Sequence, residues 1–294
     1  MKDLLQDLTV GMRGLIRRPG FTLMAVVTLA LGIGTTTSMF SVVNGVLLRP
    51  LPYEQPDRIV VVSSTEVDGS QSGWSGANFL DMHERSTVYE ALAGYRIHAF
   101  SINEEEFPGE HRGLAVTNEF FRIFGINAAL GRTLSPDADE PGGDPAVVLS
   151  HALWSFLYGE DAAVLGRTLE LNGEPYTVVG VMPRGFAYPE SAELWFTSRG
   201  PVPDPPFDFG APPEEIRGAD YFSALGRLMP DRSVQQAQQE GSLITTQLAE
   251  EYPGTNYGEG LLVRSLQDEL VGDVRPALLV LFGAVGFVLL IACA

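Results

Sequence analysis

The sequence predicts a membrane protein in which transmembrane α-helices flank an α+β domain outside the membrane. Three observations lead to this fold class. Residues 21–48 form a run of 28 residues without a charged side chain, a length typical of a transmembrane helix. A second apolar run covers residues 278–294. Between the two runs lies a long acidic segment in which strand-like and helix-like patterns are mixed.

Residues 1–20 predict an amphipathic helix that lies along the cytoplasmic surface of the membrane. Apolar side chains recur near one face of this stretch, and its charges lie mostly elsewhere. An ordinary amphipathic tail has the same pattern, but the position directly before a span favours the lipid interface. Pro19 and Gly20 mark the turn into the span.

The first apolar run is longer than one membrane crossing requires. Its 28 residues reach about 40 Å at about 1.5 Å per residue, against an acyl core of about 30 Å. We therefore expect residues 21–48 to be transmembrane helix 1, with residues 40–48 emerging as a stalk. A cleaved signal peptide is the alternative. Its apolar region would be only about 7–15 residues long and would end in an A-x-A pattern that this run lacks, so an uncleaved anchor is favoured.

Residues 277–294 predict a second transmembrane helix that is cut short. The 17 residues from Leu278 to Ala294 give about 26 Å of helix, which is marginal for a span. No basic or aromatic residue follows to anchor the far interface. We expect the full-length protein to continue beyond Ala294.

Charge predicts the orientation of the chain. Arg13, Arg17 and Arg18 precede the first span, and the positive-inside rule places them in the cytoplasm. Residues 49–276 then form a core domain outside the membrane. They hold 15 arginines against 35 acidic residues, a balance that gives solubility and argues against nucleic acid as a partner. The only cysteine, Cys293, lies in the second run, so disulfides do not stabilise this domain.

The pattern of the core domain mixes strands and helices. Strands are expected at residues 58–63, 95–103, 112–117, 146–149, 168–171, 176–181, 221–229 and 261–266, and helices at 75–93, 118–124, 151–158 and 233–252. Asn172-Gly173 is a hairpin signal, Ser233 with Gln236 fits a capping box, and six prolines make residues 201–213 an irregular excursion. Two of the helices, 75–93 and 233–252, are each flanked by strands. We therefore expect two β-α-β units of one subdomain, with a β-rich subdomain inserted between them.

No catalytic, cofactor-binding or metal site is predicted in this chain. Its only lysine is Lys2, so the chain cannot form a Walker A loop and is not itself a P-loop ATPase. Residues 73–77 nearly match a nucleophile elbow, but Ala77 replaces the last glycine and Ser75 fits a helix cap better. The histidines are scattered and lack zinc-site spacing: His83, His98, His111 and His151.

Two further patterns leave alternatives open. The acidic stretch of residues 135–145 suggests calcium, but its spacing misses the EF-hand loop and a solvated loop is favoured; its acids are Asp137, Asp139, Glu140 and Asp144. In the first span, Ala30, Gly34 and Ser38 share one helical face. Such a stripe of small residues is a candidate for close packing with another helix, and a chance arrangement explains it equally well.

Short strings along the whole chain carry a resemblance to a known family. They occur at residues 17–21 (RRPGF), 29–34 (LALGIG), 46–53 (VLLRPLPY), 120–125 (FFRIFG), 130–132 (LGR), 178–183 (VVGVMP), 226–228 (GRL) and 273–276 (DVRP), the last leading into 284–294. Each string is weak alone. As an ordered set they resemble the MacB/FtsX family of ABC-transporter permeases, especially its duplicated orphan-permease branch.

The resemblance implies a multi-pass permease of the bacterial inner membrane, with a cytoplasmic N-terminus and residues 49–276 in the periplasm. ATP would be hydrolysed on a partner ATPase, and this chain would bind no cofactor and would not be an enzyme. Hydrolysis would move the periplasmic domain and drive export or release of a substrate. The implied partners are an ABC ATPase subunit, a second permease unit (as a dimer or a duplicated half), membrane lipid and a periplasmic adaptor.

Two other classes of function remain as alternatives. A membrane-tethered extracytoplasmic sensor or binding domain would have the same flanking spans and a signalling domain downstream. A membrane-anchored hydrolase would depend on Ser75. It is the least favoured class because nothing in the sequence resembles a catalytic constellation.

Overall fold

The computed structural model describes residues 18–102, 111–135, 143–189, 192–198, 200–272 and 274–293. The chain divides into two compact units, one made of Met1–Leu51 with Gln267–Ala294 and one made of Pro52–Leu266. Of the interfacial helix predicted for residues 1–20, residues 1–17 lie outside the described part of the chain. Three acids of the loop at 135–145 also lie outside them: Asp137, Asp139 and Glu140.

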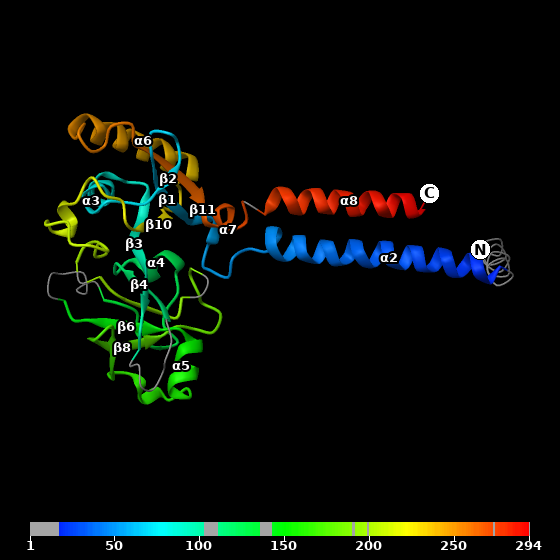
Figure 1. The fold of residues 1–294 in the computed structure, drawn as a ribbon, viewed down its shortest axis with the longest axis horizontal. Helices are drawn as coiled ribbons and strands as arrows, with labels where there is room; N and C mark the ends of the chain where they lie inside the picture. Colours follow the sequence, from blue (N-terminus) through cyan, green and yellow to red (C-terminus); the bar gives the residue numbers. More distant parts are fainter. Residues whose placement is uncertain are drawn as a thin grey trace. The chain divides into compact units, whose positions relative to one another are not determined.

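The first unit contains two antiparallel apolar helices. α2 (Pro19–Val43) continues as a π-helical turn over Asn44–Leu48, and α8 (Arg275–Cys293) lies alongside α2 (Figure 1). α2 begins at the proline itself, because the first turn of a helix needs no intrahelical N–H donor. Among the described helices, Thr22–Val43 is long and apolar enough to cross a membrane, whereas the apolar helix Arg275–Ile291 is shorter.

The predicted helix-packing stripe of α2 does not pack against another described helix of this unit. Ala30, Gly34 and Ser38 are all exposed, whereas Gly32 and Val43 on another side of α2 are buried. A Cβ atom placed on Gly34 would meet nothing within 4 Å. Close packing of the stripe with another helix stays a prediction.

The second unit is built on one mixed sheet. Its strands follow the order β11-β1-β10-β3-β4-β9-β6-β8-β5, with β2 beside β1 and β7 beside β8. One half of the sheet contains β1 (Ile59–Thr65), β2 (Gln71–Ser72), β3 (Tyr89–Phe100), β10 (Ser223–Leu228) and β11 (Gly260–Ser265), with helices α3 (Gly76–Arg85) and α6 (Val234–Glu251). β10 is antiparallel to β1 and β3, and β1 is antiparallel to β11. Hence α3 joins the parallel strands β1 and β3, and α6 joins the parallel strands β10 and β11. These are the two predicted β-α-β units, interleaved as in a split β-α-β fold.

The segment between β3 and β10 extends the same sheet. It adds β4 (His111–Val116), α4 (Phe120–Phe124), β5 (Leu130–Gly131), β6 (Ala146–Leu149), α5 (His151–Tyr158), β7 (Thr168–Leu171), β8 (Glu174–Val181) and β9 (Leu194–Thr197). β4 pairs antiparallel with β3, and the pairs β4–β9 and β6–β8 are parallel. The predicted insertion is therefore β-rich, and it continues the sheet of the first half.

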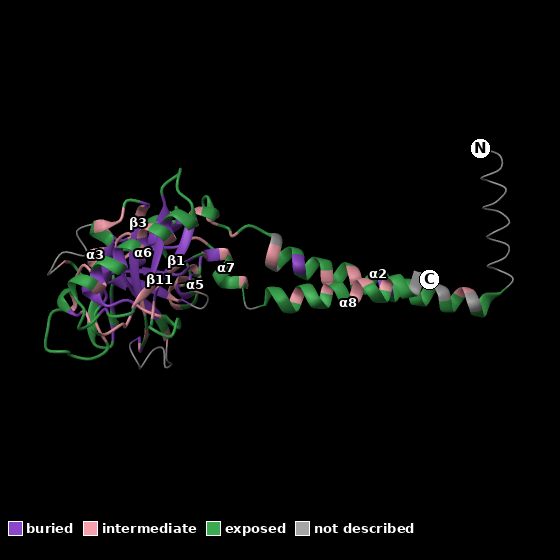
Figure 2. Cartoon of the chain, turned by 90° about the horizontal axis from the view of Figure 1, so that it is seen from above, coloured by how far each residue is buried: buried purple, intermediate pink, exposed green. Residues whose placement is uncertain are grey.

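The core of this unit, which is the region of buried residues in Figure 2, includes two apolar clusters and the buried aromatic side chains of α4. In the first cluster, Phe79 and Met82 of α3 and Ile244 and Leu248 of α6 pack on Val62 of β1 and its neighbours. In the second, Leu153 of α5 packs on strands β6, β8 and β9 through Val147, Leu149, Val178, Val181 and Leu194. Burial of these side chains is the main stabilising contribution in this unit, because residues 52–266 contain no cysteine that could form a disulfide.

The helix expected at residues 75–93 is shorter in the structure. It ends at Arg85, Ser86 has an extended backbone, and β3 already begins at Tyr89. The prediction was wrong for residues 86–93 because Thr87-Val88-Tyr89 is a β-branched and aromatic run that favours a strand over a helix.

Local turn and cap signals are mostly confirmed. Asn172 and Gly173 have φ values of 52° and 82° between β7 and β8, as a primed hairpin turn requires. Ser233 and Gln236 form the predicted capping box of α6. Ser75 occupies the N-cap position of α3, but its side chain makes no cap hydrogen bond and its Oγ is buried without a partner among the described residues.

Candidate functional site

Residues 53–58, here called the lead-in segment, connect the chain to the sheet of the second unit. Arg227 on β10 is only 4% exposed, and its Nη1 donates to the carbonyl oxygens of Glu54 and Ile123 at 3.0 Å each. The backbone N–H of Glu54 donates to the carbonyl oxygen of Phe124 at 3.3 Å. Arg227 therefore binds the lead-in segment and α4 to β10 through their main chains.

Glu90 on β3 balances the positive charges of Arg227 and Arg58. Its Oε2 lies 3.8 Å from Nε of Arg227 and forms an ion pair with Arg58 of the lead-in segment. Nε of Arg58 also donates to the carbonyl oxygen of Leu228 at 2.7 Å. A buried charge without a partner costs several kcal/mol, so Glu90 allows Arg227 to be buried. Arg122 is more than half exposed and reaches Glu90 only at 3.9 Å.

Aromatic rings of α4 complete this attachment. The ring centroid of Tyr53 lies 4.8 Å from that of Phe124 in an edge-on arrangement, and burial raises the pKa of the Tyr53 hydroxyl. α4 lies on the face of the sheet opposite α3 and α6. Leu92 packs in the cluster beneath those two helices, whereas Tyr95, three residues further along β3, meets Phe120 of α4 at 5.9 Å.

Glycine is required where α4 meets the lead-in segment. Gly125 ends α4 with a φ of +64°, and a Cβ atom there would lie 2.7 Å from Oε2 of Glu54. A left-handed backbone with no room for a side chain suits glycine alone. The strings at residues 46–53, 120–125 and 226–228 thus converge on one place, because each supplies residues to this attachment.

Two more of the strings pair with each other. β5 and β8 place Gly131 opposite Gly180. A Cβ on Gly131 would lie 2.3 Å from the carbonyl oxygen of Val179, and one on Gly180 would lie 2.0 Å from that of Arg132. The glycines of both strings therefore allow two backbones to approach closely.

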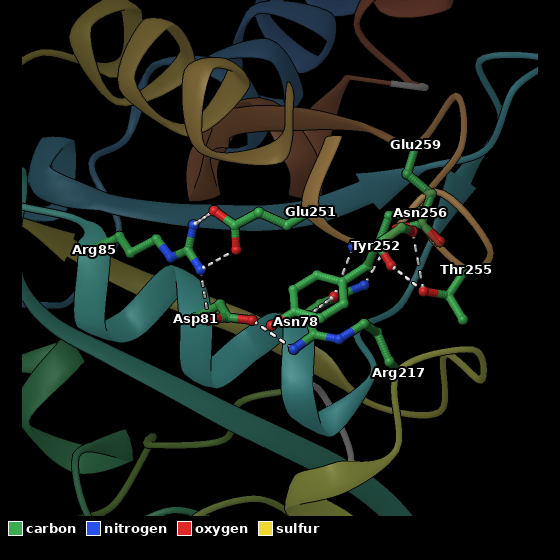
Figure 3. A network of polar contacts seen from close by, with 9 residues as sticks. All are labelled: Asn78, Asp81, Arg85, Arg217, Glu251, Tyr252, Thr255, Asn256 and Glu259. Atoms are coloured by element: carbon green, nitrogen blue, oxygen red, sulfur yellow. Dashed lines mark hydrogen bonds and ion pairs between the residues drawn. The ribbon is translucent and has the colours of Figure 1, made fainter. Parts of the chain in front are cut away.

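A second polar cluster, the α3–α6 network, joins α3, the segment before β10 and the loop after α6 (Figure 3). Nη1 of Arg217 donates to Oδ1 of Asn78 at 2.6 Å, and its Nη2 pairs with Asp81 at 2.7 Å. Its guanidinium carbon lies 3.7 Å from the ring centroid of Tyr252. Nδ2 of Asn256 donates to the same oxygen of Asn78 at 2.8 Å.

The other end of this network fastens α3 to the end of α6. Both terminal nitrogens of Arg85 donate to the carboxylate of Glu251 at 2.8 Å, and one also reaches Asp81 at 3.1 Å. Bidentate pairs of this kind are the stronger ion pairs in proteins. The network therefore connects the two β-α-β units with each other and with the returning end of the inserted segment.

The described residues contain no group of three or more His, Cys, Asp or Glu side chains that could hold a metal ion. The histidines that the sequence singles out remain apart, each with its own polar neighbour: His83 with Glu119, His98 with Arg96, His111 with Glu193 and His151 with Arg184. The absence of a catalytic, cofactor or metal site stays a prediction from the sequence.

Sequence reasoning missed the residues of the attachment. Arg227 had a visible signal, since it is an arginine in the middle of an apolar strand pattern, where a charge needs a partner. Its partners Glu54 and Ile123 had none, because they lie more than a hundred residues away and contribute backbone carbonyl groups.

Together, the fold and the attachment define an α+β domain whose lead-in segment follows a long apolar helix. The family model described as the MacB-like periplasmic core domain matches residues 22–240. Since this match covers more than half of the chain, the protein belongs to the family that carries this domain, and the chain contains the MacB-like periplasmic domain of an ABC-type transporter permease.

Solved structures of transporter domains align with this chain at low sequence identity, and one of them has a TM-score above 0.5. The domain of a putative permease protein from Porphyromonas gingivalis aligns with a TM-score of 0.51 and 17% identity, over 74% of this chain and 92% of that one. The periplasmic region of MacB from Actinobacillus actinomycetemcomitans aligns with a TM-score of 0.49, 11% identity and the same coverage. The extracellular domain of the noncanonic ABC-type transporter YknZ from Gram-positive bacteria aligns with a TM-score of 0.48 and 13% identity, over 69% and 99% of the two chains. No curated protein matches the chain in sequence.

Proposed function

We propose that this chain is the permease subunit of an ABC-type transporter. A partner ATPase hydrolyses ATP, the periplasmic domain moves in response, and a substrate is exported or released. Membership of the MacB-like family supports a partner ATPase and a second permease unit. The single lysine, Lys2, supports the assignment of ATP to the partner, because a P-loop on this chain would need its own lysine.

The attachment of the lead-in segment carries the proposal. Residues 49–58 are the covalent route from the first apolar helix to the sheet. Within the second unit, Arg227 binds the main chain of this route at Glu54, and Arg58 binds β10 and Glu90. A segment held by main-chain hydrogen bonds and a partly buried ion pair transmits displacement to the sheet better than a free linker does, since it has little conformational freedom to absorb the movement.

We assign the chain to the bacterial inner membrane as a multi-pass protein with a cytoplasmic N-terminus and residues 49–276 in the periplasm. The apolar helix Thr22–Val43 and the arginines before it support this topology. Membrane lipid surrounds the helices, a periplasmic adaptor is a further partner, and the chain itself is neither an enzyme nor a binder of cofactors.

The proposal is tested on the full-length protein in lipid nanodiscs with its co-expressed ATPase. Cys293→Ser removes the only cysteine of residues 1–294, and any cysteine elsewhere in the full-length protein is also replaced by serine. Tyr257→Cys, at a side chain that is 78% exposed, then takes a nitroxide label. Pulsed EPR then measures the distance between labels on the two permease units. We expect this distance to change between the nucleotide-free complex and the complex trapped with ATP on a hydrolysis-deficient ATPase.

Two controls separate this proposal from the alternatives. ATP added without the ATPase should leave the label distance unchanged. Equal distances in both nucleotide states of the complete complex would contradict the proposal. A change that follows an added extracytoplasmic ligand, with no ATPase present, would favour the sensor class instead.

A further inference from the structure

Three carboxylates meet at one end of three neighbouring strands. β1 is antiparallel to both β10 and β11, so the end of β1 lies beside the beginnings of the other two strands. Glu66 directly follows β1, Asp220 shortly precedes β10, and Glu259 directly precedes β11. The topology of the sheet therefore gathers these acids from segments that are about 150 and 190 residues apart in the sequence.

Arg217, whose charge acts on Glu259, is engaged elsewhere. Arg217 acts favourably on Glu259, but its guanidinium group is already bound by Asp81 at 2.7 Å and by Oδ1 of Asn78 at 2.6 Å. It also lies over the ring of Tyr252. One arginine shared in this way does not neutralise three acids.

Glu259 is also part of the contact between the loop at residues 252–259 and α3 (Figure 3). Its Oε2 accepts from Nδ2 of Asn78 at 3.2 Å, and the Oδ1 of Asn78 accepts from Asn256 of the same loop at 2.8 Å. Thr255 in turn donates to Asn256 at 2.7 Å. Asn78 thus forms hydrogen bonds with two residues of the loop, Asn256 and Glu259, and the bond with Glu259 is made by its carboxyl group.

The charge state of Glu259 affects this contact. Burial, followed by the neighbouring charges of Asp220 and Glu66, raises the pKa of Glu259 to about 7. Burial also raises the pKa of Asp220, whose Oδ2 accepts from Ser72 Oγ at 2.7 Å. Asn78 donates to Glu259 in either charge state, so this hydrogen bond does not by itself oppose ionisation. Burial and the charges of Asp220 and Glu66 do oppose it in the closed position, and an ionised Glu259 escapes both by rotating toward solvent, which breaks the hydrogen bond with Asn78.

We propose that Glu259 is a proton-controlled latch between the two β-α-β units. The neutral carboxyl group closes the loop at residues 252–259 onto Asn78 of α3, and the ionised carboxylate, repelled by Glu66 and Asp220, loosens that loop. α3 belongs to the β-α-β unit of β1 and β3, and the loop leads from α6 into β11 of the other β-α-β unit, so protonation tightens the contact between these two β-α-β units. This inference does not depend on the proposed transport function.

Hydrogen exchange of the full chain in detergent tests the latch. After correction for the pH dependence of intrinsic exchange, protection of residues 252–259 should be up to about tenfold higher at pH 6 than at pH 8, because the opening equilibrium follows the difference between the carboxyl pKa values in the closed and open loop. Glu259→Gln, which stays neutral, should retain the high protection at both pH values.

Asp68→Asn is the matched control, since it removes one negative charge near the same end of the sheet. Asp68 is exposed and accepts from the backbone N–H of Ser70 at 2.8 Å, so this variant should keep the wild-type pH dependence. Asp220→Asn should shift the midpoint of the transition to lower pH, because one repelling charge is gone. A merely structural role for Asp220 would change protection equally at both pH values.

Two outcomes would overturn the latch. One is equal corrected protection of the loop at pH 6 and pH 8 in the wild-type chain. The other is a Glu259→Gln variant whose loop keeps the full pH dependence of the wild type.

Discussion

The side-chain amide of Gln238 donates to the carbonyl oxygen of Leu261 at 2.7 Å, and its oxygen accepts from the backbone N–H of Val263 at 2.8 Å. β11, which contains both partners, is the terminal strand on its side of the sheet. The main-chain groups of such a strand form a template for pairing with another chain. Gln238, which projects from α6, therefore takes the place of a neighbouring strand at these two groups.

Gln238→Ala should destabilise the domain and expose this edge. Two partly buried backbone groups lose their partners, which predicts a loss of about 1–2 kcal/mol in the free energy of unfolding. The free edge should also promote self-association. Thermal unfolding of the detergent-purified chain and size-exclusion chromatography measure the two effects.

Gln239→Ala is the matched control, because Gln239 is the next residue of α6 and is exposed. It should change the free energy of unfolding by less than about 0.5 kcal/mol and leave the oligomeric state unchanged. Equal effects of the two substitutions would show that the helix, not the protection of the edge, is responsible.

Some of the fold was predictable because its signals are local. Asn172-Gly173 and Ser233 with Gln236 act on their own turn and helix end, and both are confirmed. The helix predicted over residues 75–93 was wrong at its end, where the preference of Thr87-Val88-Tyr89 for a strand is satisfied by pairing with β10, in which Leu228 lies opposite Tyr89. β10 is distant from β3 in the sequence, so this pairing leaves no periodic pattern in the residues around Tyr89.

The attachment of the lead-in segment was not predictable from spacing for a related reason. Arg227 and Glu54 are 173 residues apart, and the acceptor is a main-chain carbonyl group that any residue would provide. The resemblance of three separate strings to one family marked Arg227 and the neighbours of Glu54, but not the contact between them. The structure supplies the physical reason, since the strings meet where Gly125 has no space for a side chain.

Arg227→Met should release the lead-in segment. The substitution keeps most of the apolar volume but removes the donor to Glu54 and Ile123, and it leaves their carbonyl groups unpaired in a buried region. We expect a loss of about 3 kcal/mol in the free energy of unfolding. Hydrogen exchange of residues 53–58 should rise more than that of α6.

Arg122→Met serves as the control for the loss of an arginine near Glu90. Its side chain is 57% exposed, and its contacts with Glu90 and Glu119 are 3.9 and 3.4 Å long. Exposed ion pairs contribute about 0–1 kcal/mol, so this variant should be nearly as stable as the wild type. A comparable loss in both variants would contradict the role assigned to Arg227.

Gly131→Ala should be far more destabilising than Gly166→Ala. Both glycines have positive φ values, +71° and +81°, but only Gly131 would place its Cβ against a backbone atom, 2.3 Å from the carbonyl oxygen of Val179. Gly166 has nothing within 4 Å of that position.

The backbone conformation alone costs about 1 kcal/mol, which is the loss in the free energy of unfolding expected for Gly166→Ala. Gly131→Ala should lose about 3 kcal/mol or more because β5 must also move away from β8. Chemical denaturation of the two variants provides the comparison, and equal losses would show that close approach of the strands is unimportant.

His98 makes the domain sensitive to acid. Burial, and then the neighbouring charge of Arg96, lower the pKa of His98 from 6.5 to about 4. Between these two values the unfolded chain binds a proton that the folded chain does not, so stability falls as the pH drops from about 6.5 to about 4. His98→Gln should remove this part of the acid sensitivity, a difference of about 1–2 kcal/mol at pH 4 after allowance for partial solvation. Unfolding curves at pH 7 and pH 4 measure it.

His83→Gln should show the opposite dependence on pH. The hydrogen bond with Glu119 at 3.2 Å raises the pKa of His83, so the interaction stabilises the folded chain below pH 6.5 and is lost as the pH rises through the folded value. The variant should therefore be less stable than the wild type in acid and equal to it in alkaline solution. Opposite signs for two His→Gln substitutions in one domain would exclude a general effect of replacing histidine. If both variants changed in the same direction, the assignment of the acid sensitivity to burial of His98 beside Arg96 would be wrong.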